Sequence, residues 1–237
     1  MIELDHVVKK YGKSIVIKEA TGSFQDGKIY GLAGYNGVGK TTLLKTISGV
    51  FRPDGGRILA DGEDAVGNSA FRSRSFLMTE ELFFDPQSTL RRMKDFYRGY
   101  YPSWDEQIYQ GMLSLSGLDE EAAIAGFSKG MQRQAGLILA VSTSPRFLFL
   151  DETFDGLDVV RRELLARILR ICVDTRKILV IVTSHYLNEL ENMVDEIFLI
   201  EKGILTRPDT EGRSLEHYFT KGMEVSDEKI RSIFSKE

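Results

Sequence analysis

A glycine-rich segment that ends in lysine and threonine constrains the fold of this chain more than any other feature. It runs Gly34-Tyr35-Asn36-Gly37-Val38-Gly39-Lys40-Thr41 and matches the pattern G-x-x-x-x-G-K-[ST]. An apolar stretch, Ile29 to Ala33, precedes it, and a helix-like run, Thr42 to Ile47, follows it. A strand, a tight turn and a helix in this order predict a phosphate-binding loop, whereas a glycine-rich turn with a chance lysine would not require these neighbours.

Each part of this loop has a chemical role in the prediction. Glycines let the backbone wrap around phosphates with its N–H groups pointing inward, and the helix that follows adds the positive end of its dipole. Lys40 can reach the β- and γ-phosphates of a nucleotide, and the Thr41 hydroxyl can ligate Mg²⁺. The residues expected to bind the nucleotide here are Gly34, Tyr35, Asn36, Gly37, Val38, Gly39, Lys40, Thr41 and Thr42.

Short apolar runs that alternate with longer amphipathic stretches predict an α/β fold. The runs are continuous in apolarity, which indicates strands covered on both faces, and they comprise Ile29–Ala33, Phe147–Leu150, Ile178–Val182 and Ile197–Ile200. The stretch from Val159 to Asp174 has its apolar residues on one helical stripe. Strands that alternate with helices imply a parallel sheet.

Two other parts of the chain have different patterns. Near the N-terminus, Ile2–Val8, Ser14–Phe24 and Gly55–Leu59 predict antiparallel strands joined by turns. The stretch from Leu90 to Ser116 is helical in pattern and rich in aromatic residues. We expect those aromatic side chains to pack within a small helical subdomain rather than to stack on a ligand.

One of the apolar strands ends in two acidic residues, Asp151 and Glu152. The carboxyl ends of parallel strands form the ligand crevice of such a sheet. Asp151 at this tip can hold Mg²⁺, directly or through water, and Glu152 is placed to polarise an attacking water as a general base.

Composition excludes several classes of protein. Of 237 residues, 42% are apolar and 28% charged, as in soluble globular proteins, and the net charge of −4 lacks the basic excess of nucleic-acid binders. Cys172 is the only cysteine, which excludes an internal disulfide and fits a reducing compartment. The acidic first residues do not resemble a signal peptide, and no apolar run approaches the ~20 residues that span a bilayer. We expect a cytoplasmic protein.

Several motifs beyond the phosphate loop resemble those of the ATP-binding-cassette (ABC) family. Phe127-Ser128-Lys129-Gly130-Met131-Gln132 is similar to the family signature, usually written L-S-G-G-Q, and it precedes the Asp151-Glu152 pair. A Gly156-Leu157-Asp158 turn follows, and Thr183-Ser184-His185 comes after the next strand. The resemblance covers about Met1 to Leu205. The chain therefore looks like the nucleotide-binding subunit of an ABC transporter.

The resemblance also implies an architecture. It predicts a phosphate-loop NTPase core with a parallel sheet, an N-terminal antiparallel β subdomain and a helical subdomain, at about residues 89–127, that leads into the signature. Together these form an ABC ATPase domain over residues 1–205. Residues 206–237 form a short polar C-terminal extension with two short helical candidates.

Further roles come from the resemblance alone. Tyr11 matches the aromatic residue that stacks on adenine, although a strand-end tyrosine needs no such role. Ser128 and Gly130 match the signature that binds the γ-phosphate of ATP held by the opposite subunit, and Asp158 matches the loop that links the two sites. Ser128 and Asp158 also suit an ordinary helix N-cap. His185 matches the switch histidine that contacts the γ-phosphate and supports Glu152.

The sequence departs from the family pattern at several positions, among them Thr153-Phe154, where Pro-Thr is usual after the acidic pair, and Phe127 at the start of the signature. The usual glutamine that contacts Mg²⁺ and the membrane partner is missing, and its position falls on Thr79, or on Glu80 or Glu81 with a shift in alignment. The signature has Lys129 where a glycine is usual. This S-K-G-M form, together with the aromatic segment from Phe96 to Asp105, resembles cassettes of bacterial exporters with separately encoded membrane subunits.

These resemblances imply an ATPase that drives export. ATP and Mg²⁺ would be bound between two cassettes, either identical or different, and transmembrane permease subunits would place the pair on the inner face of the cell membrane. An alternative is an ABC ATPase in a soluble process such as DNA repair or cofactor assembly. A kinase or GTPase would leave the signature segment unexplained, and the guanine-reading Asn/Thr-Lys-x-Asp pattern is absent from the sequence. The transported substrate is not written in this chain.

Overall fold

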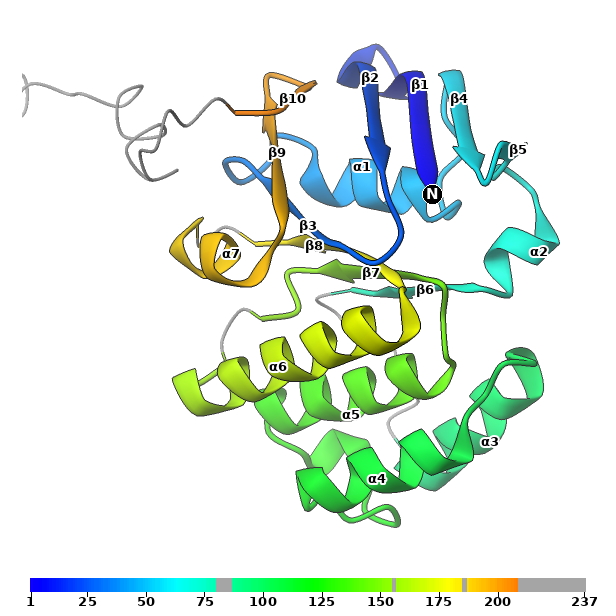
Figure 1. Cartoon of the computed structure of the whole chain (residues 1–237), viewed down its shortest axis with the longest axis vertical. Coiled ribbons are helices and arrows are strands. Elements are labelled where there is room, and N and C mark those ends of the chain that lie inside the picture. Colours follow the sequence, from blue (N-terminus) through cyan, green and yellow to red (C-terminus); the bar gives the residue numbers. More distant parts are fainter. Residues whose placement is uncertain (80–86, 155–156, 185–186, 209–237) are drawn as a thin grey trace, which may run out of the picture.

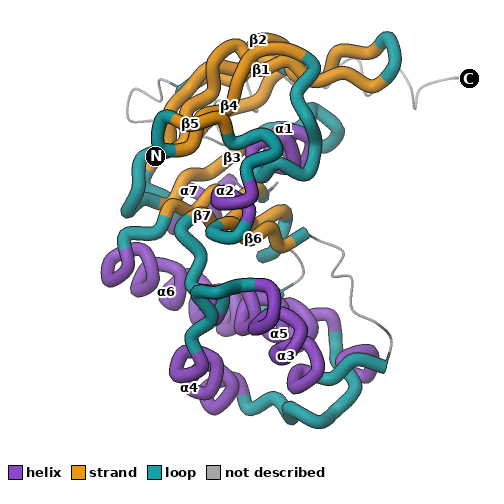
Figure 2. The backbone as a smooth tube through the Cα atoms, turned by 90° about the vertical axis from the view of Figure 1, so that its right-hand side faces the viewer, coloured by secondary structure: helices purple, strands orange, loops and turns teal. Residues whose placement is uncertain are grey.

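Two β-sheets with helices between and beneath them make up the described part of the protein. The computed structural model describes residues 1–79, 87–154, 157–184 and 187–208. In Figure 1 an antiparallel sheet lies at the top, helix α1 lies below it, and a largely parallel sheet crosses the middle above the remaining large helices. The view turned by 90° in Figure 2 shows the same layers from the side.

The upper sheet has the strand order β2-β1-β4-β5, and its neighbouring strands are antiparallel. Its strands are β1 (Ile2–Tyr11), β2 (Ser14–Phe24), β4 (Gly55–Ala60) and β5 (Glu63–Asp64). The antiparallel N-terminal subdomain is therefore confirmed. β1 continues past the expected end at Val8, through irregular pairing with β2, and brings Tyr11 to the end of the strand.

The central sheet has the strand order β10-β9-β3-β8-β7-β6, and all neighbours are parallel except β10 on β9. Its strands are β3 (Ile29–Ala33), β6 (Ser75–Met78), β7 (Phe147–Asp151), β8 (Leu179–Thr183), β9 (Glu196–Glu201) and β10 (Ile204–Thr206). The four predicted parallel strands are confirmed. β6 and β10 were not expected, because runs of three or four residues carry little pattern.

The helices are α1 (Lys40–Ile47), α2 (Ser69–Arg72), α3 (Leu90–Tyr100), α4 (Glu106–Ser116), α5 (Lys129–Ser142), α6 (Val159–Arg176) and α7 (Leu187–Met193), with a 3₁₀ turn at Ile124–Gly126. The segment expected to be helical from Leu90 to Ser116 is two helices. Pro102 lies between them, and it disfavours helical geometry in the residue before it. The Asp105 side chain then caps α4 by accepting hydrogen bonds from the N–H groups of Gln107 and Ile108, both at 3.0 Å.

Alternating residues of β7 divide the core between the two faces of the central sheet. Phe147 and Phe149 face the cluster that includes Leu43 and Leu44 of α1. Leu148 and Leu150 face the cluster beneath the sheet, to which α5 and α6 contribute. This period of two is that of an extended strand, so α1 and α5 lie on opposite faces of the same sheet.

The helical subdomain has a small core of its own. Its buried residues include Leu90 of α3, Tyr109 of α4 and Leu139 of α5, with Trp104 packed against Tyr109 at a ring-centroid distance of 5.5 Å. The prediction that the aromatic side chains of this segment are packing residues is confirmed for these rings, but it is wrong for Phe96 and Tyr100, which are exposed. Among the described residues, no helix has both the length and the apolar character to cross a bilayer. The two helical candidates of the polar extension fall in residues 209–237, outside the described residues.

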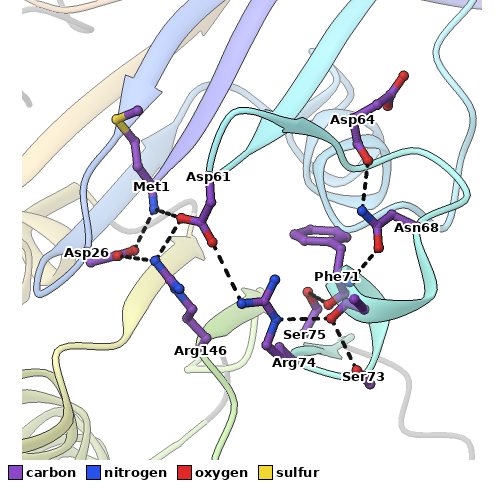
Figure 3. Close-up of polar contacts among 11 residues, drawn as sticks. Met1, Asp26, Asp61, Asp64, Asn68, Phe71, Ser73, Arg74, Ser75 and Arg146 are labelled. Carbon is purple, nitrogen blue, oxygen red and sulfur yellow. Dashed lines mark hydrogen bonds and ion pairs between the residues drawn. The ribbon is translucent and has the colours of Figure 1, made fainter.

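An ionic cluster joins the two sheets at the end where β3 and β7 begin (Figure 3). The Arg146 guanidinium, just before β7, donates to Asp26 and Asp61 at 2.7 Å each. The amino group of Met1, at the start of β1, donates to the same two carboxylates at 2.8 and 3.0 Å. Arg74, just before β6, adds an ion pair with Asp61 at 3.8 Å. We call these five residues the basal clamp. They lie at the amino ends of the parallel strands, opposite the carboxyl ends of those strands.

Candidate active site

The phosphate loop connects the end of β3 at Ala33 to the start of α1 at Lys40. Gly39 has φ +113°, and a Cβ atom there would lie 2.9 Å from Val16 Cγ1 and 3.0 Å from Ile17 Cδ1 on β2. A side chain at Gly39 would therefore be strained in conformation and would clash with these two side chains of β2. Among the described residues, no side chain caps the first turn of α1, which leaves its N–H groups available to an anion.

The Lys40 side chain folds back over the loop. Its ammonium group donates to the carbonyl of Gly34 at 2.8 Å and to that of Tyr35 at 3.3 Å, and the residue is only 4% exposed. Lys40 Nζ lies 3.9 Å from Glu152 Oε1, so a carboxylate balances the buried charge. The structure thus brings the predicted phosphate-binding cation and the predicted general base together.

Asp151 joins three elements at the carboxyl end of β7. Its Oδ1 accepts hydrogen bonds from the Thr41 hydroxyl at 3.0 Å and from the Thr183 hydroxyl at 2.8 Å. Asp151 is 3% exposed, and its strand position is directly opposite Thr183 of β8. The two oxygens predicted to hold a metal, Thr41 Oγ1 and Asp151 Oδ1, are therefore adjacent.

This pair of oxygens fits Mg²⁺. The ion prefers oxygen ligands and is usually bound by one or two protein groups together with phosphates and water. Within the described ranges, no group of three or more histidine, cysteine or acidic side chains could hold a metal by itself. The donor set therefore suits a cation that arrives with a nucleotide rather than one held by a protein cage.

Glu152 has an unusual backbone conformation that its neighbours maintain. Its φ is +49°, a left-handed value that costs a residue with a side chain about 1–3 kcal/mol. Its N–H donates to Thr183 Oγ1 at 2.9 Å and to the Thr183 carbonyl at 3.2 Å. Its carbonyl accepts a hydrogen bond from the Arg133 guanidinium of α5. Strain held by specific contacts is typical of functional sites.

Tyr11 is half exposed at the end of β1. Its ring meets Phe51 edge-on at a centroid distance of 6.2 Å, and Phe51 lies 5.9 Å from the ammonium group of Lys45 on α1. Tyr11 is therefore tied to the helix that follows the phosphate loop and retains an exposed ring. Tyr35, Asn36 and Val38 lie in the loop itself, and Thr42 lies in the first turn of α1.

The signature segment opens α5. Ser128 is the N-cap, and its hydroxyl accepts a hydrogen bond from the N–H of Met131 at 3.3 Å. The Gln132 side chain donates to the carbonyls of Ile124 and Phe127, both at 3.2 Å, and so fixes the turn that precedes the helix. Since α5 and α1 cover opposite faces of the central sheet, Ser128 and the phosphate loop belong to different layers of the molecule.

Asp158 is the N-cap of α6, and its carboxylate accepts a hydrogen bond from the N–H of Arg161 at 2.9 Å. Arg161 also lies close to the signature, because a Cβ atom on Gly130 would lie 3.1 Å from Arg161 Nη1. The N-cap interpretations of Ser128 and Asp158 are thus observed, and they are compatible with further roles at a second subunit.

Some predicted residues lie outside the described residues. These are His185, and Glu80 and Glu81 at the position of the usual glutamine, whereas Thr79 follows directly after β6 and is partly buried. Two residues of the site were not predicted. Thr183 could have been found from its place at the end of the strand beside β7, but the contact from Arg133 has no sequence signal because it depends on how α5 packs.

Comparisons with known proteins identify the family of this chain. A family model described as "ABC transporter" matches residues 17–155. The chain is 30% identical over 206 residues to the ABC transporter ATP-binding protein YtrB of Bacillus subtilis, covering 87% of this chain and 70% of that protein. It is 31% identical over 218 residues to the Nod factor export ATP-binding protein I of Sinorhizobium fredii, covering 90% of this chain and 62% of that protein. Both relatives extend beyond the matched part.

Solved structures share the fold. An ATP-binding subunit of an ABC transporter superposes with a TM-score of 0.85 at 22% identity, over 94% of this chain and all of that one. A dimeric bacterial ABC transporter cassette superposes with a TM-score of 0.75 at 20% identity, over 87% of this chain and 97% of that one.

Proposed function

Because this chain belongs to the family of ABC transporter ATP-binding domains, which hydrolyse ATP to power transport, we propose that it drives export through partner membrane subunits. The observation that carries the proposal is the contact between the phosphate loop and the acidic strand end, where Thr41 and Asp151 meet beside Lys40 and Glu152. Export as the direction of transport is supported by the printed name of the Nod factor relative.

The proposed binding mode uses groups that are already oriented. The phosphates of ATP lie against the loop N–H groups and the start of α1, and Lys40 turns from the loop carbonyls to the phosphate oxygens. The exposed ring of Tyr11 provides a surface for the adenine base. Thr41 and Asp151 would hold Mg²⁺, and the bound ion would neutralise charge on the phosphates.

Glu152 is the proposed general base. Its carboxylate lies beside Lys40, and its backbone is held in one conformation by Thr183 and Arg133. In this position it accepts the proton of the water that attacks the γ-phosphate, and preorganisation avoids a search for the reactive geometry. We assign to His185 a supporting contact to Glu152 and to the phosphate, on the family resemblance alone.

A second cassette completes the site in this proposal. Members of the family work as pairs, and the similarity to a dimeric cassette supports the same arrangement here. Ser128 and Gly130 then face the ATP held by the opposite subunit, and the N–H groups of the first turn of α5 that the Ser128 hydroxyl does not cap provide an anion site. Asp158, whose N-cap partner Arg161 lies close to Gly130, belongs to the turn proposed to connect the two sites. The two subunits are identical or closely related.

An exposed aromatic patch on α3 is the proposed contact with the membrane subunits. Phe96 and Tyr100 are 60% and 73% exposed, and their rings stack at a centroid distance of 5.9 Å. Beneath them, Tyr97 and Tyr101 pack on Phe76 of β6, the strand that leads to Thr79. Exposed aromatic rings on a rigid base are typical of residues that dominate interfaces. This contact would place the protein on the inner face of the cell membrane.

Purification from membranes in mild detergent tests this proposal. The unmodified chain should copurify with an integral membrane protein, and the Phe96→Ala/Tyr100→Ala variant should retain less than about a tenth of it, since such anchors contribute 2 kcal/mol or more. The control is Leu115→Ala, which removes an equally exposed side chain from α4. ATPase activity of the purified chain should be the same in both variants. Equal recovery of the membrane protein by both would contradict the proposed contact.

A further inference from the structure

Arg133 is a residue of the signature helix that holds the backbone of the proposed general base. Its guanidinium, in the second turn of α5, donates to the carbonyl of Glu152. The helix begins at Ser128, which in the proposed dimer faces the ATP of the opposite subunit. A single side chain therefore connects the helix that would contact one ATP to the loop that would hydrolyse the other.

The contact from Arg133 is one of two that hold the backbone of Glu152. On the other side, the N–H of Glu152 donates to both oxygens of Thr183, at 2.9 and 3.2 Å. Glu152 is held between them at φ +49°, which is unfavourable for a residue with a side chain. Loss of either side allows φ to relax, and because Cβ is attached to the same Cα, relaxation redirects the carboxylate away from Lys40.

The two ends of α5 are held differently. Its later turns, including Leu137, Ala140 and Val141, pack in the core cluster that contains Leu148 and Leu150 of β7. The exposed Ser128 caps its first turn, and Arg133 lies between this turn and the packed part. A movement at the start of α5 therefore reaches the Glu152 carbonyl through Arg133 before it reaches the core of the sheet.

We propose that Arg133 is a positioning residue for Glu152 that makes hydrolysis at one site depend on engagement of the signature with the other ATP. It does not touch the substrate. Arg133 orients the Glu152 carboxylate through the Glu152 carbonyl. The orientation is complete only when the ATP held by the opposite subunit fixes the start of α5. This inference rests on the proposed role of Glu152 and adds to it a connection within one subunit between the two composite sites.

Steady-state hydrolysis by Arg133→Met is the first test. We expect kcat to fall about tenfold while KM for ATP stays within twofold, because the substitution disturbs the base and not the phosphate loop. Arg133→Lys, which can donate to the same carbonyl, should recover at least half of the lost activity. Arg167→Met, which replaces an exposed arginine of α6, is the control and should behave as the unmodified protein. A kcat for Arg133→Met equal to that of the control would overturn the proposal.

A measurement on the nucleotide-free protein separates a local effect on the backbone of Glu152 from a loss of overall stability. Amide hydrogen exchange of the peptide spanning residues 147–154 should be faster in Arg133→Met than in Arg167→Met, while the thermal unfolding midpoint stays the same. If Arg133→Met leaves the exchange rate of this peptide unchanged, Arg133 does not hold the backbone of Glu152. If Arg133→Met does not fold, Arg133→Lys provides the same comparison with a smaller expected change.

A double-mutant cycle tests the dependence on the signature. If Arg133 transmits engagement of Ser128, adding Arg133→Met to Ser128→Ala should lower kcat by less than twofold further. Two independent effects that multiply would overturn the connection between the sites. The variant Glu152→Gln separates the two hypotheses: undiminished hydrolysis in it refutes the proposed role of Glu152, whereas its loss together with normal activity of Arg133→Met refutes only this inference.

Discussion

At the scale of single residues, the site depends on a hydroxyl that joins two acidic residues. The Thr183 hydroxyl donates to the Asp151 carboxylate at 2.8 Å and accepts from the Glu152 N–H at 2.9 Å. Both bonds are buried or partly buried, where an unpaired polar group is costly. Thr183 is thus a bridge between the proposed metal ligand and the proposed base.

Replacement of this hydroxyl gives a first prediction. Thr183→Val keeps the shape of the side chain and leaves its partners unsatisfied, so we expect about 1–3 kcal/mol less stability and a severalfold higher Mg²⁺ concentration for half-maximal ATPase activity. Urea unfolding and a Mg²⁺ titration measure these effects. Thr183→Ser, which retains the hydroxyl, is the control. A valine variant that matches the serine variant in both assays would show that the bridge has no role.

The sequence predicts the role of a residue well where a motif specifies both the residue type and the strand or helix beside it. Lys40, Thr41 and Asp151 follow from a glycine pattern or from an apolar strand, and the structure brings their polar atoms together. Arg133 could not be assigned in the same way, and Thr183 could be found only from its place at the end of the strand beside β7. Their partners are backbone or side-chain atoms far along the chain, and only the register of β8 on β7 and the packing of α5 bring them within reach.

At the scale of helices and strands, the start of α6 has two possible roles that can be separated. Asp158 caps the helix through the N–H of Arg161, and it also occupies the turn proposed to face a second subunit. Its side chain is about half exposed, which leaves it accessible to a partner. An N-cap requires a hydrogen-bond acceptor, whereas an ionic contact across subunits requires the charge.

Two substitutions of Asp158 distinguish these roles. Asp158→Ala removes the acceptor and should lower the free energy of unfolding by about 1 kcal/mol, whereas Asp158→Asn keeps an acceptor and should leave it nearly unchanged. Chemical denaturation measures the difference. We expect both variants to weaken the ATP-dependent dimer in light scattering. If the free energy of unfolding falls equally in Asp158→Ala and Asp158→Asn, or in neither variant, Asp158 does not stabilise the protein as an N-cap.

Element boundaries follow from local chemistry more than from hydrophobic pattern. The sequence indicates one helical stretch from Leu90 to Ser116, but the chain between Tyr101 and Asp105 is not helical, because Pro102 interrupts α3 and Asp105 starts α4. β6 and β10 are short edge strands, and their pairing depends on β7 and β9 rather than on their own residues. Long, continuously apolar strands were predicted correctly because burial on both faces leaves a pattern.

At the scale of the whole molecule, the basal clamp connects the two sheets at one end and the nucleotide would connect them at the other. Burial opposes ionisation of Asp26, but hydrogen bonds from the Met1 amino group and from Arg146 outweigh it and hold the pKa of Asp26 below its ordinary value. A carboxyl with a lowered pKa in the folded state stabilises it above the unfolded pKa of about 3.9. That stabilisation is lost as the pH falls through the folded value.

The basal clamp therefore predicts that the free energy of unfolding depends on pH in the acidic range. Arg146→Ala should be about 1 kcal/mol less stable than the unmodified chain at pH 7, since the groups are partly exposed and screened. The difference should shrink as the pH falls below about 4, because the Asp26 carboxyl is protonated first in the unfolded chain and, at a lower pH, in the folded protein. Urea unfolding between pH 7 and pH 3 measures this trend, with Lys13→Ala in an exposed turn as the control. A difference that stays constant over this range would exclude a role for the Asp26 charge.

Glu152 is the proposed base of a nucleotide site that a second cassette completes. The most direct measurement compares Glu152→Gln with Glu163→Gln, an exposed residue of α6, in ATP hydrolysis, ATP binding and light scattering. We predict that Glu152→Gln hydrolyses ATP at least about 100-fold more slowly, binds ATP with unchanged affinity and accumulates as an ATP-bound dimer. Hydrolysis by Glu152→Gln at the rate of Glu163→Gln would contradict the account.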